Sequence, residues 1–207
     1  MNNNGRLTIT LLLLSGLMGP TPLAVAAPGQ GHDMDMGSVE GLQANFAHKE
    51  LAVLNEVAVP PAFSEGLGAA YGRYLEAAAA LVTADIPQLD EAATKMREVV
   101  DGLQAEQLDG AAREAWLGHQ EVLRTGLHQL VTASDLATKR EHFSHVSEAM
   151  YCALRSFGGI KQSVNVAYCP MAFDRKGAYW LSDERAIANP YLGPDMATCG
   201  ELKETLR

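Results

Sequence analysis

The sequence predicts an all-α fold: an antiparallel four-helix up-down bundle with a C-terminal irregular or β-hairpin extension packed on it. Apolar residues recur at every third or fourth position from Ala62 to Phe157, which is the spacing of helices that bury one face. Residues that favour helix ends interrupt this pattern at intervals. After Gly159 the apolar residues alternate instead, which is typical of strands.

Capping residues divide the helical region into four expected helices. Asp85 is a typical N-cap, and Pro87 follows in the first turn, where a missing N–H costs nothing. The connections are only a few residues long, so consecutive helices should pack as antiparallel neighbours. The expected helices run from Ala62 to Thr83, from Asp85, from Asp109, and from Ser134 or Asp135 to Gly158–Gly159.

The residues after the helices predict a small β-hairpin. Val164 to Cys169 and Ala178 to Leu181 read as short strands around a polar turn that ends at Gly177. Two strands alone are only marginally stable, so the hairpin should pack against the bundle. The apolar surface for this docking would come from the aromatic residues Tyr168, Phe173, Tyr179, Trp180 and Tyr191.

The N-terminal region resembles an export signal. Arg6 precedes a short apolar run from Leu7 to Met18, and Ala24-Val25-Ala26 fits the small-x-small cleavage rule. The run is shorter than the ~20 residues that cross a bilayer, so we expect a periplasmic protein without stable membrane insertion. The expected organisation is a signal peptide (1–26), a flexible segment (27–61), the bundle (62–160) and a Cys/Met-containing tail lobe (161–207).

Charge and motif content argue against several functions. The net charge of −9 over 207 residues makes nucleic acid and anionic membrane surfaces poor partners. The sequence contains no Walker loop, no dinucleotide-binding glycine turn and no HExxH motif. We therefore do not expect an enzyme.

Two pairs of sulfur-containing residues suggest a metal site in the tail. Cys169 and Met171 would project from the same face if the strand continued to Met171, and Met196 and Cys199 are about one turn apart. Thiolate and thioether sulfur select soft ions such as Cu(I), and also silver or another soft metal. The alternative is a Cys169–Cys199 disulfide, which would close a loop of about 30 residues and stabilise the fold by roughly 3–4 kcal/mol.

Histidines and a third cysteine on the fourth helix could add ligands. With about 100° per residue, His142 lies beside the apolar stripe that includes Met150, while His145 and Cys152 share the side facing away from it. A tail folded over that side would bring these donors near the cysteines, and otherwise the two histidines would be solvated. Further candidate donors are His32, Met34 and Met36 in the flexible segment, which reads either as a labile copper-binding tail or as a plain linker. His119 and Met96 are expected in the core, His119 with a hydrogen bond.

Several motifs of the tail and one motif of the fourth expected helix carry a resemblance. They are Arg140-Glu141-His142-Phe143 with Ser147, Tyr168-Cys169-Pro170-Met171-Ala172, Gly177-Ala178-Tyr179-Trp180-Leu181-Ser182, Ile187-Ala188-Asn189-Pro190-Tyr191-Leu192-Gly193 and Met196-Ala197-Thr198-Cys199-Gly200. These motifs resemble those of a little-characterised bacterial domain. It occurs alone in exported proteins and at the C-terminus of some periplasmic adaptor (membrane-fusion) proteins of copper/silver efflux systems. The resemblance covers roughly Phe63 to Leu202 and implies a helical-bundle domain linked to periplasmic heavy-metal handling. By position it implies His142, Cys169, Met171, Met196 and Cys199 as metal-site candidates, whereas Cys152 departs from the pattern.

These observations together favour a periplasmic Cu(I)-binding protein that sequesters copper or delivers it to efflux components, an adaptor or a pump. The chain lacks the long hairpin and barrel sequence of a full adaptor, so it is not expected to bridge the pump itself. The alternative is a disulfide-stapled, non-metal interaction module associated with a heavy-metal efflux system.

Overall fold

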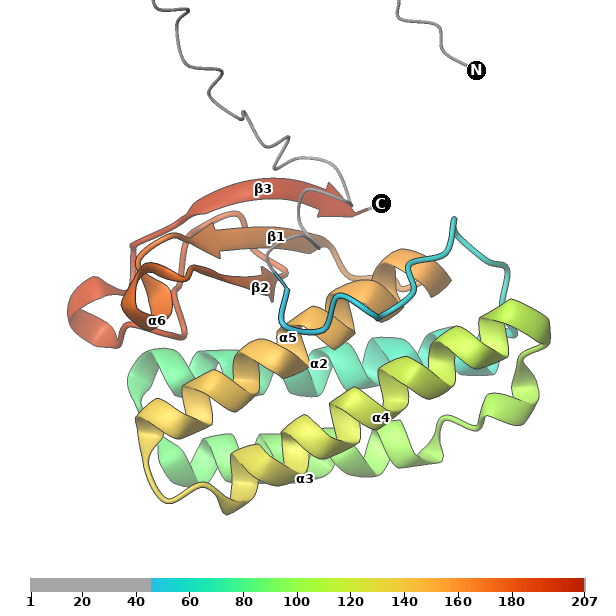
Figure 1. Cartoon of the computed structure of the whole chain (residues 1–207), viewed down its shortest axis with the longest axis horizontal. Helices are drawn as coiled ribbons and strands as arrows, with labels where there is room; N and C mark the ends of the chain where they lie inside the picture. The colour runs from blue at the N-terminus through green and yellow to red at the C-terminus, as the bar shows by residue number, and fades with distance from the viewer. Residues whose placement is uncertain (1–45, 207) are drawn as a thin grey trace, which may run out of the picture. The chain divides into compact units, whose positions relative to one another are not determined.

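The computed structural model describes residues 46–206, which are mostly helical with a small three-stranded antiparallel sheet at the C-terminal end (Figure 1). The expected signal peptide lies outside this range, as do residues 27–45 of the expected flexible segment with His32, Met34 and Met36. None of the helices within residues 46–206 combines the length and apolar character needed to cross a membrane.

Four long helices occupy the ranges expected from the capping pattern. Asp85 accepts a hydrogen bond from Gln88 N at 3.0 Å, and Asp135, rather than Ser134, accepts one from Thr138 N at 2.9 Å. Asp109 precedes its helix without a side-chain capping bond. The helices are α2 (Pro61–Thr83), α3 (Ile86–Gly102), α4 (Gly110–Thr132) and α5 (Leu136–Phe157).

Each long helix packs on the next one in sequence, and Figure 1 shows the four lying side by side. The link between α2 and α3 is only Ala84 and Asp85, so α3 must turn back along α2. A short 3₁₀ turn, Ala105–Gln107, lies in the connection to α4. Aromatic side chains fill the interior, where the Tyr74 and Phe143 rings stack with centroids 4.9 Å apart.

Two expected core residues are confirmed. Met96 and His119 are both fully buried. His119 Nε2 lies 2.8 Å from the carbonyl oxygen of Ala52, and burial lowers the pKa of His119 to about 4. The neutral imidazole therefore donates a hydrogen bond in the core, as a structural histidine does.

Residues 46–60 contain no helix, although Ala44 to Val57 has a weak helical pattern. The segment instead lies extended along the protein, with Phe46 and Leu51 buried. Its backbone bonds to α5 near Ser156, where Leu54 N donates to Ser156 Oγ at 3.0 Å and Val57 N donates to Ser156 O at 2.8 Å, and also at Glu148. These contacts, which sequence periodicity does not reveal, anchor the segment on α5.

The predicted hairpin is confirmed, and a third strand extends it. Strands β1 (Val164–Cys169) and β2 (Ala178–Ser182) pair antiparallel, and β3 (Glu201–Leu206) pairs antiparallel with the other edge of β1. The strand order is therefore β2-β1-β3. The loop between β1 and β2 is a short helical piece, α6 (Ala172–Arg175), rather than a tight turn.

The sheet covers α5 on the side opposite to the other long helices (Figure 1). Every residue from Val146 to Leu154 is buried, so α5 is enclosed on all sides over two turns. The expectation that Cys152 lies outside the core is wrong, because that expectation assumed a simple bundle in which one face of α5 stays exposed. Cys152 is 0% exposed.

Candidate metal centre

Cys169 and Cys199 come together where β1 and β3 meet. The last pair between these strands joins Tyr168 to Glu201, which leaves Cys169 one residue beyond it and Cys199 two residues before it. Their sulfur atoms lie 3.4 Å apart, within hydrogen-bond distance for sulfur. Cys169 is fully buried and Cys199 is partly exposed, so the pair lies at the surface of the core. The two sulfur-containing motifs of the tail therefore meet in the tertiary structure through Cys169 and Cys199.

Gly200 allows this close approach. Its φ is +141°, and a Cβ there would lie 2.6 Å from the Trp180 ring and 3.0 Å from the carbonyl oxygen of Tyr168. A larger residue could not follow Cys199 without moving β3 away from β1. Close packing at this position therefore explains why glycine follows Cys199.

A buried asparagine holds the loop that carries Cys199. Asn189 is 0% exposed, and its Nδ2 donates to Cys199 O at 2.6 Å while its backbone N donates to Ala197 O at 2.7 Å. Asn189 Oδ1 accepts from Tyr191 N at 2.7 Å. The Tyr191 hydroxyl in turn contacts Ser147 Oγ on α5 at 3.2 Å. The Asn-Pro-Tyr motif therefore anchors the cysteine loop to the bundle.

The two methionines next to the cysteines are the exposed parts of the site. Met171 is 42% exposed and Met196 is 47% exposed. Cys199 N donates to Met196 O at 3.0 Å, so these residues share one turn as predicted. The expected continuation of the strand to Met171 is wrong, because β1 ends at Cys169 and Met171 has helical backbone angles before α6. Both methionines are therefore exposed to solvent, and both lie between the two cysteines in sequence.

The contact between the two thiols favours the protonated form of Cys199. The hydrogen bond with Cys169 is the main cause that raises the pKa of Cys199, and burial adds to it. Cys199 is therefore protonated at neutral pH, and a metal ion must displace this proton to bind as a thiolate complex.

The other predicted donors lie elsewhere. Within residues 46–206, no third His, Cys, Asp or Glu ligand atom lies within 4.8 Å of both sulfur atoms, so His142 does not complete the thiol site. Met150 and Cys152 are fully buried in the core around α5. His145 takes part in a different group.

That second group, which the sequence analysis missed, consists of His48, His145 and Glu148. One potential ligand atom from each lies within 4.8 Å of the other two. His145 and Glu148 are three residues apart on α5, a spacing that sequence inspection could have identified. His48 comes from the extended segment before α2, whose docking no sequence pattern indicates.

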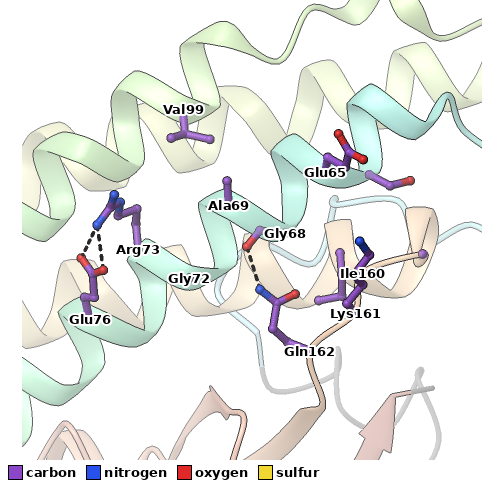
Figure 2. A pocket seen from close by; sticks show the side chains of 12 residues that line it. Glu65, Gly68, Ala69, Gly72, Arg73, Glu76, Val99, Ile160, Lys161 and Gln162 are labelled. Atoms are coloured by element: carbon purple, nitrogen blue, oxygen red, sulfur yellow. Dashed lines mark hydrogen bonds and ion pairs between the residues drawn. The ribbon is translucent and has the colours of Figure 1, made fainter.

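A further cavity on the described part of the chain is lined by Arg73, Glu76 and Gln162 among others. It has a volume of about 470 Å³ and lies between α2 and the residues that follow α5 (Figure 2). Arg73 pairs with Glu76 at 2.7 Å, and Gln162 Nε2 donates to Gly68 O at 3.5 Å. Arg73, Glu76 and Gln162, three of its polar lining residues, are thus engaged in these contacts.

The comparisons with known proteins concern the helices. No curated protein and no solved structure matches this chain. Residues 70–162 match the family model described as "Protein of unknown function (DUF3347)". This range extends from within α2 to Gln162, two residues before β1, and therefore excludes both Cys169 and Cys199. The match thus spans most of the helical part of the chain.

Proposed function

We propose that this protein is a periplasmic heavy-metal-binding protein that holds Cu(I) between Cys169 and Cys199 and either sequesters it or delivers it to an efflux system. The 3.4 Å separation of the two sulfur atoms carries this proposal. The resemblance of the tail motifs to a domain of copper/silver efflux adaptors supports it, as does the signal-like N-terminus. Silver, or another soft metal, would suit the same donors.

The donor set fits a soft cation. Two thiolates bonded to one metal at the ~2.3 Å typical of zinc–sulfur bonds lie about 3.8 Å apart in tetrahedral geometry, so the pair needs to open only slightly. Met196, one turn from Cys199, and Met171 would supply thioether sulfur from the exposed side. Cu(I) would be held there by soft coordination, and the thiolates would be protected from oxidation while they are bound.

The helical part would serve as the scaffold of this site. We take the four long helices as an antiparallel up-down bundle on which the sheet rests, with the Asn189 and Tyr191 bonds setting the position of the cysteine loop. A rigid support of this kind keeps two donors at a fixed separation and lowers the ordering cost of binding. The exposed methionines leave one side open for transfer to an adaptor or pump.

The second candidate is a disulfide-stapled interaction module. The same sulfur separation favours it, since oxidation needs the two atoms to approach from 3.4 Å to about 2.05 Å. An oxidising periplasm would promote that bond. It would tie β1 to the start of β3 and leave no thiolate for copper.

Thiol counting on the exported chain separates these two functions. If copper binds, Cys169 and Cys199 should be reactive without metal, unreactive with one equivalent of Cu(I), and free of an internal bridge by mass. A mass lower by about 2 Da, which is unaffected by copper, would establish the disulfide instead. Persistent reactivity of both thiols with Cu(I) present would overturn the copper proposal.

Methionine exchange tests the rest of the donor set. Met171→Leu with Met196→Leu keeps side-chain volume and removes both thioethers, so Cu(I) affinity should fall while stability changes by less than about 1.5 kcal/mol. Met96→Leu is the matched control, because it removes a thioether that is fully buried in the core. Equal Cu(I) affinity in the double variant and the control would show that the methionines are not ligands.

A further inference from the structure

We propose that His48, His145 and Glu148 form a second metal site, separate from the thiol pair, that takes a borderline divalent cation such as Zn²⁺. One potential ligand atom from each residue lies within 4.8 Å of the other two. Among residues 46–206 this is the one set of three His, Cys, Asp or Glu side chains with that convergence. It shares no residue with the thiol site, so either proposal can fail without the other.

Backbone hydrogen bonds attach the segment that carries His48 to the Glu148 carboxylate. Ala47 N donates to Glu148 Oε1 at 3.0 Å, and His48 N donates to Glu148 Oε2 at 3.1 Å. Each carboxylate oxygen keeps a further lone pair that could face a cation. The His48 and His145 rings meet edge-to-face with centroids 4.9 Å apart. The segment before α2 and one turn of α5 thus present their donors to the same point.

A carboxylate orients the first imidazole as in metalloproteins. His48 Nδ1 lies 3.1 Å from Glu50 Oε1. A proton on Nδ1 donated to this carboxylate leaves the lone pair of Nε2 for a metal, which is the usual arrangement behind a metal-bound histidine. Glu50 would therefore act on the metal through His48 rather than as a ligand.

The second imidazole has an unsatisfied nitrogen. His145 Nδ1 is buried and has no hydrogen-bond partner among residues 46–206. Burial is the main cause that lowers the pKa of His145, and the neighbouring His48 and His142 add to it. Nδ1 is one of the two imidazole nitrogens through which a histidine can bind a metal ion.

The donor types select the class of metal. Two imidazole nitrogens and one carboxylate oxygen match the His₂Glu sets of catalytic zinc sites. Mg²⁺ and Ca²⁺ prefer oxygen ligands alone, and Cu(I) prefers sulfur. A cavity of about 300 Å³, lined by His48, His145, Glu50 and Glu121 among others, adjoins the group and has room for water at the remaining coordination positions.

The site would link two distant parts of the chain. His48 belongs to the extended segment and Glu148 to α5, 100 residues away in sequence. A bound cation would add a cross-link to the contacts that this segment makes with α5. Because metal binds only the docked arrangement, Zn²⁺ should raise the melting temperature of the protein, and the stabilisation should grow with the logarithm of the Zn²⁺ concentration above Kd.

Zn²⁺ titration against a chromophoric chelator tests the site in the full chain with Cys169→Ala and Cys199→Ala. One equivalent of Zn²⁺ should bind, and His145→Ala should weaken this binding at least tenfold. His128→Ala, which removes an exposed histidine on α4, should leave it unchanged. The inference is overturned if no Zn²⁺ binds, or if His145→Ala and His128→Ala behave alike.

Two measurements avoid any loss of folding in these variants. Glu50→Gln alters only an exposed side chain, and it should weaken Zn²⁺ binding roughly 10–100-fold if Glu50 orients His48. In the wild-type chain, Zn²⁺ should shift the imidazole NMR signals of His48 and His145 and not those of His128. Shifts confined to His128, or unchanged affinity in Glu50→Gln, would contradict the proposed coordination.

Discussion

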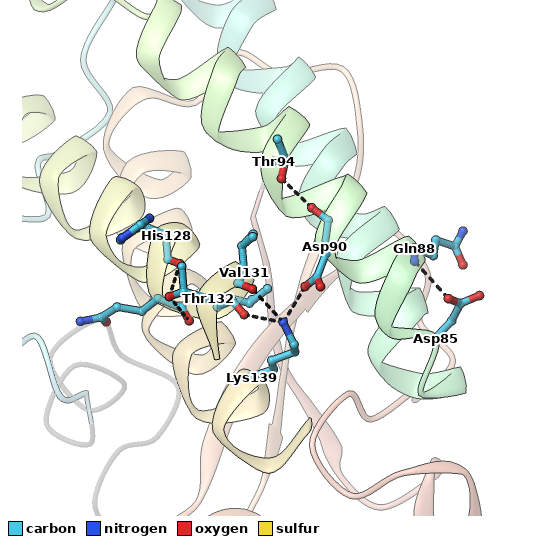
Figure 3. A network of polar contacts seen from close by, with 10 residues as sticks. Asp85, Gln88, Asp90, Thr94, His128, Val131, Thr132 and Lys139 are labelled. Atoms are coloured by element: carbon cyan, nitrogen blue, oxygen red, sulfur yellow. Dashed lines mark hydrogen bonds and ion pairs between the residues drawn. The ribbon is translucent and has the colours of Figure 1, made fainter. Parts of the chain in front are cut away.

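Replacement of Lys139 by methionine should destabilise the protein far more than removal of a surface lysine. Lys139 is a buried cation at the start of α5 whose side chain is 3% exposed (Figure 3). Its Nζ donates to Asp90 Oδ1 of α3 at 2.7 Å, and to the carbonyl oxygens of Leu130 and Val131 in the last turn of α4 at 2.8 Å and 3.2 Å. One ammonium group therefore connects three helices.

The size of the expected stability loss follows from the groups that Lys139→Met leaves without their charged partner. Removing one partner of a fully buried ion pair costs about 3–5 kcal/mol, because the other charge stays desolvated. The Asp90 side chain is 33% exposed, so water can solvate part of its charge. The two carbonyl groups end a helix and each lose a charged donor, which adds to the cost. Methionine nearly preserves the volume, and we expect a loss of about 2–4 kcal/mol.

Urea unfolding monitored by far-UV circular dichroism measures this loss as a lower midpoint at unchanged m-value. Lys95→Met is the matched control, since Lys95 pairs with Glu91 one turn away while their side chains are 46% and 65% exposed. That change should cost less than about 1 kcal/mol. If Lys139→Met and Lys95→Met lower the free energy of unfolding equally, the buried ion pair does not stabilise the junction of the helices.

Two further predictions concern other positions. Because the pKa of His119 is lowered from 6.5 to about 4, the unfolded state binds more protons between these values, and the wild type should lose about 3 kcal/mol of stability as pH falls from 6.5 to 4. His119→Gln keeps a donor for Ala52 and should flatten this dependence in urea titrations, whereas an equally steep curve would refute the assignment. Gly200→Ala should cost at least about 1 kcal/mol by thermal or urea unfolding, because of its positive φ and the clash with Trp180. Gly118→Ala on α4, where a Cβ meets nothing within 4 Å, should instead stabilise by up to about 1 kcal/mol, and the reverse order would contradict the packing argument.

Helix positions were predictable because their signals are local. An N-cap such as Asp85 or Asp135 acts on a backbone group three residues away, and apolar periodicity is read within a few turns. The hairpin of β1 and β2 was predictable for the same reason. Strand β3 was not, because Glu201–Leu206 is a polar edge strand that lacks the apolar alternation of a buried one.

The residues of the candidate sites were likewise predictable only where the signal is local in sequence. Cys169 and Cys199 attract attention through their motifs, although their separation of 3.4 Å depends on the pairing of β1 with β3. The orientation of Cys152 was predicted incorrectly, because the sheet buries the face of α5 that a bundle alone would expose. His48 was missed altogether, since nothing near it in sequence indicates that it docks beside His145.

The sequence by itself therefore determined the helices, the hairpin and the two sulfur motifs, all of which depend on interactions within a few residues. Only the tertiary structure decided which donors meet, because that outcome depends on how the sheet and the segment before α2 pack around α5. Such packing sums many weak contacts between distant residues, and no single stretch of sequence encodes it.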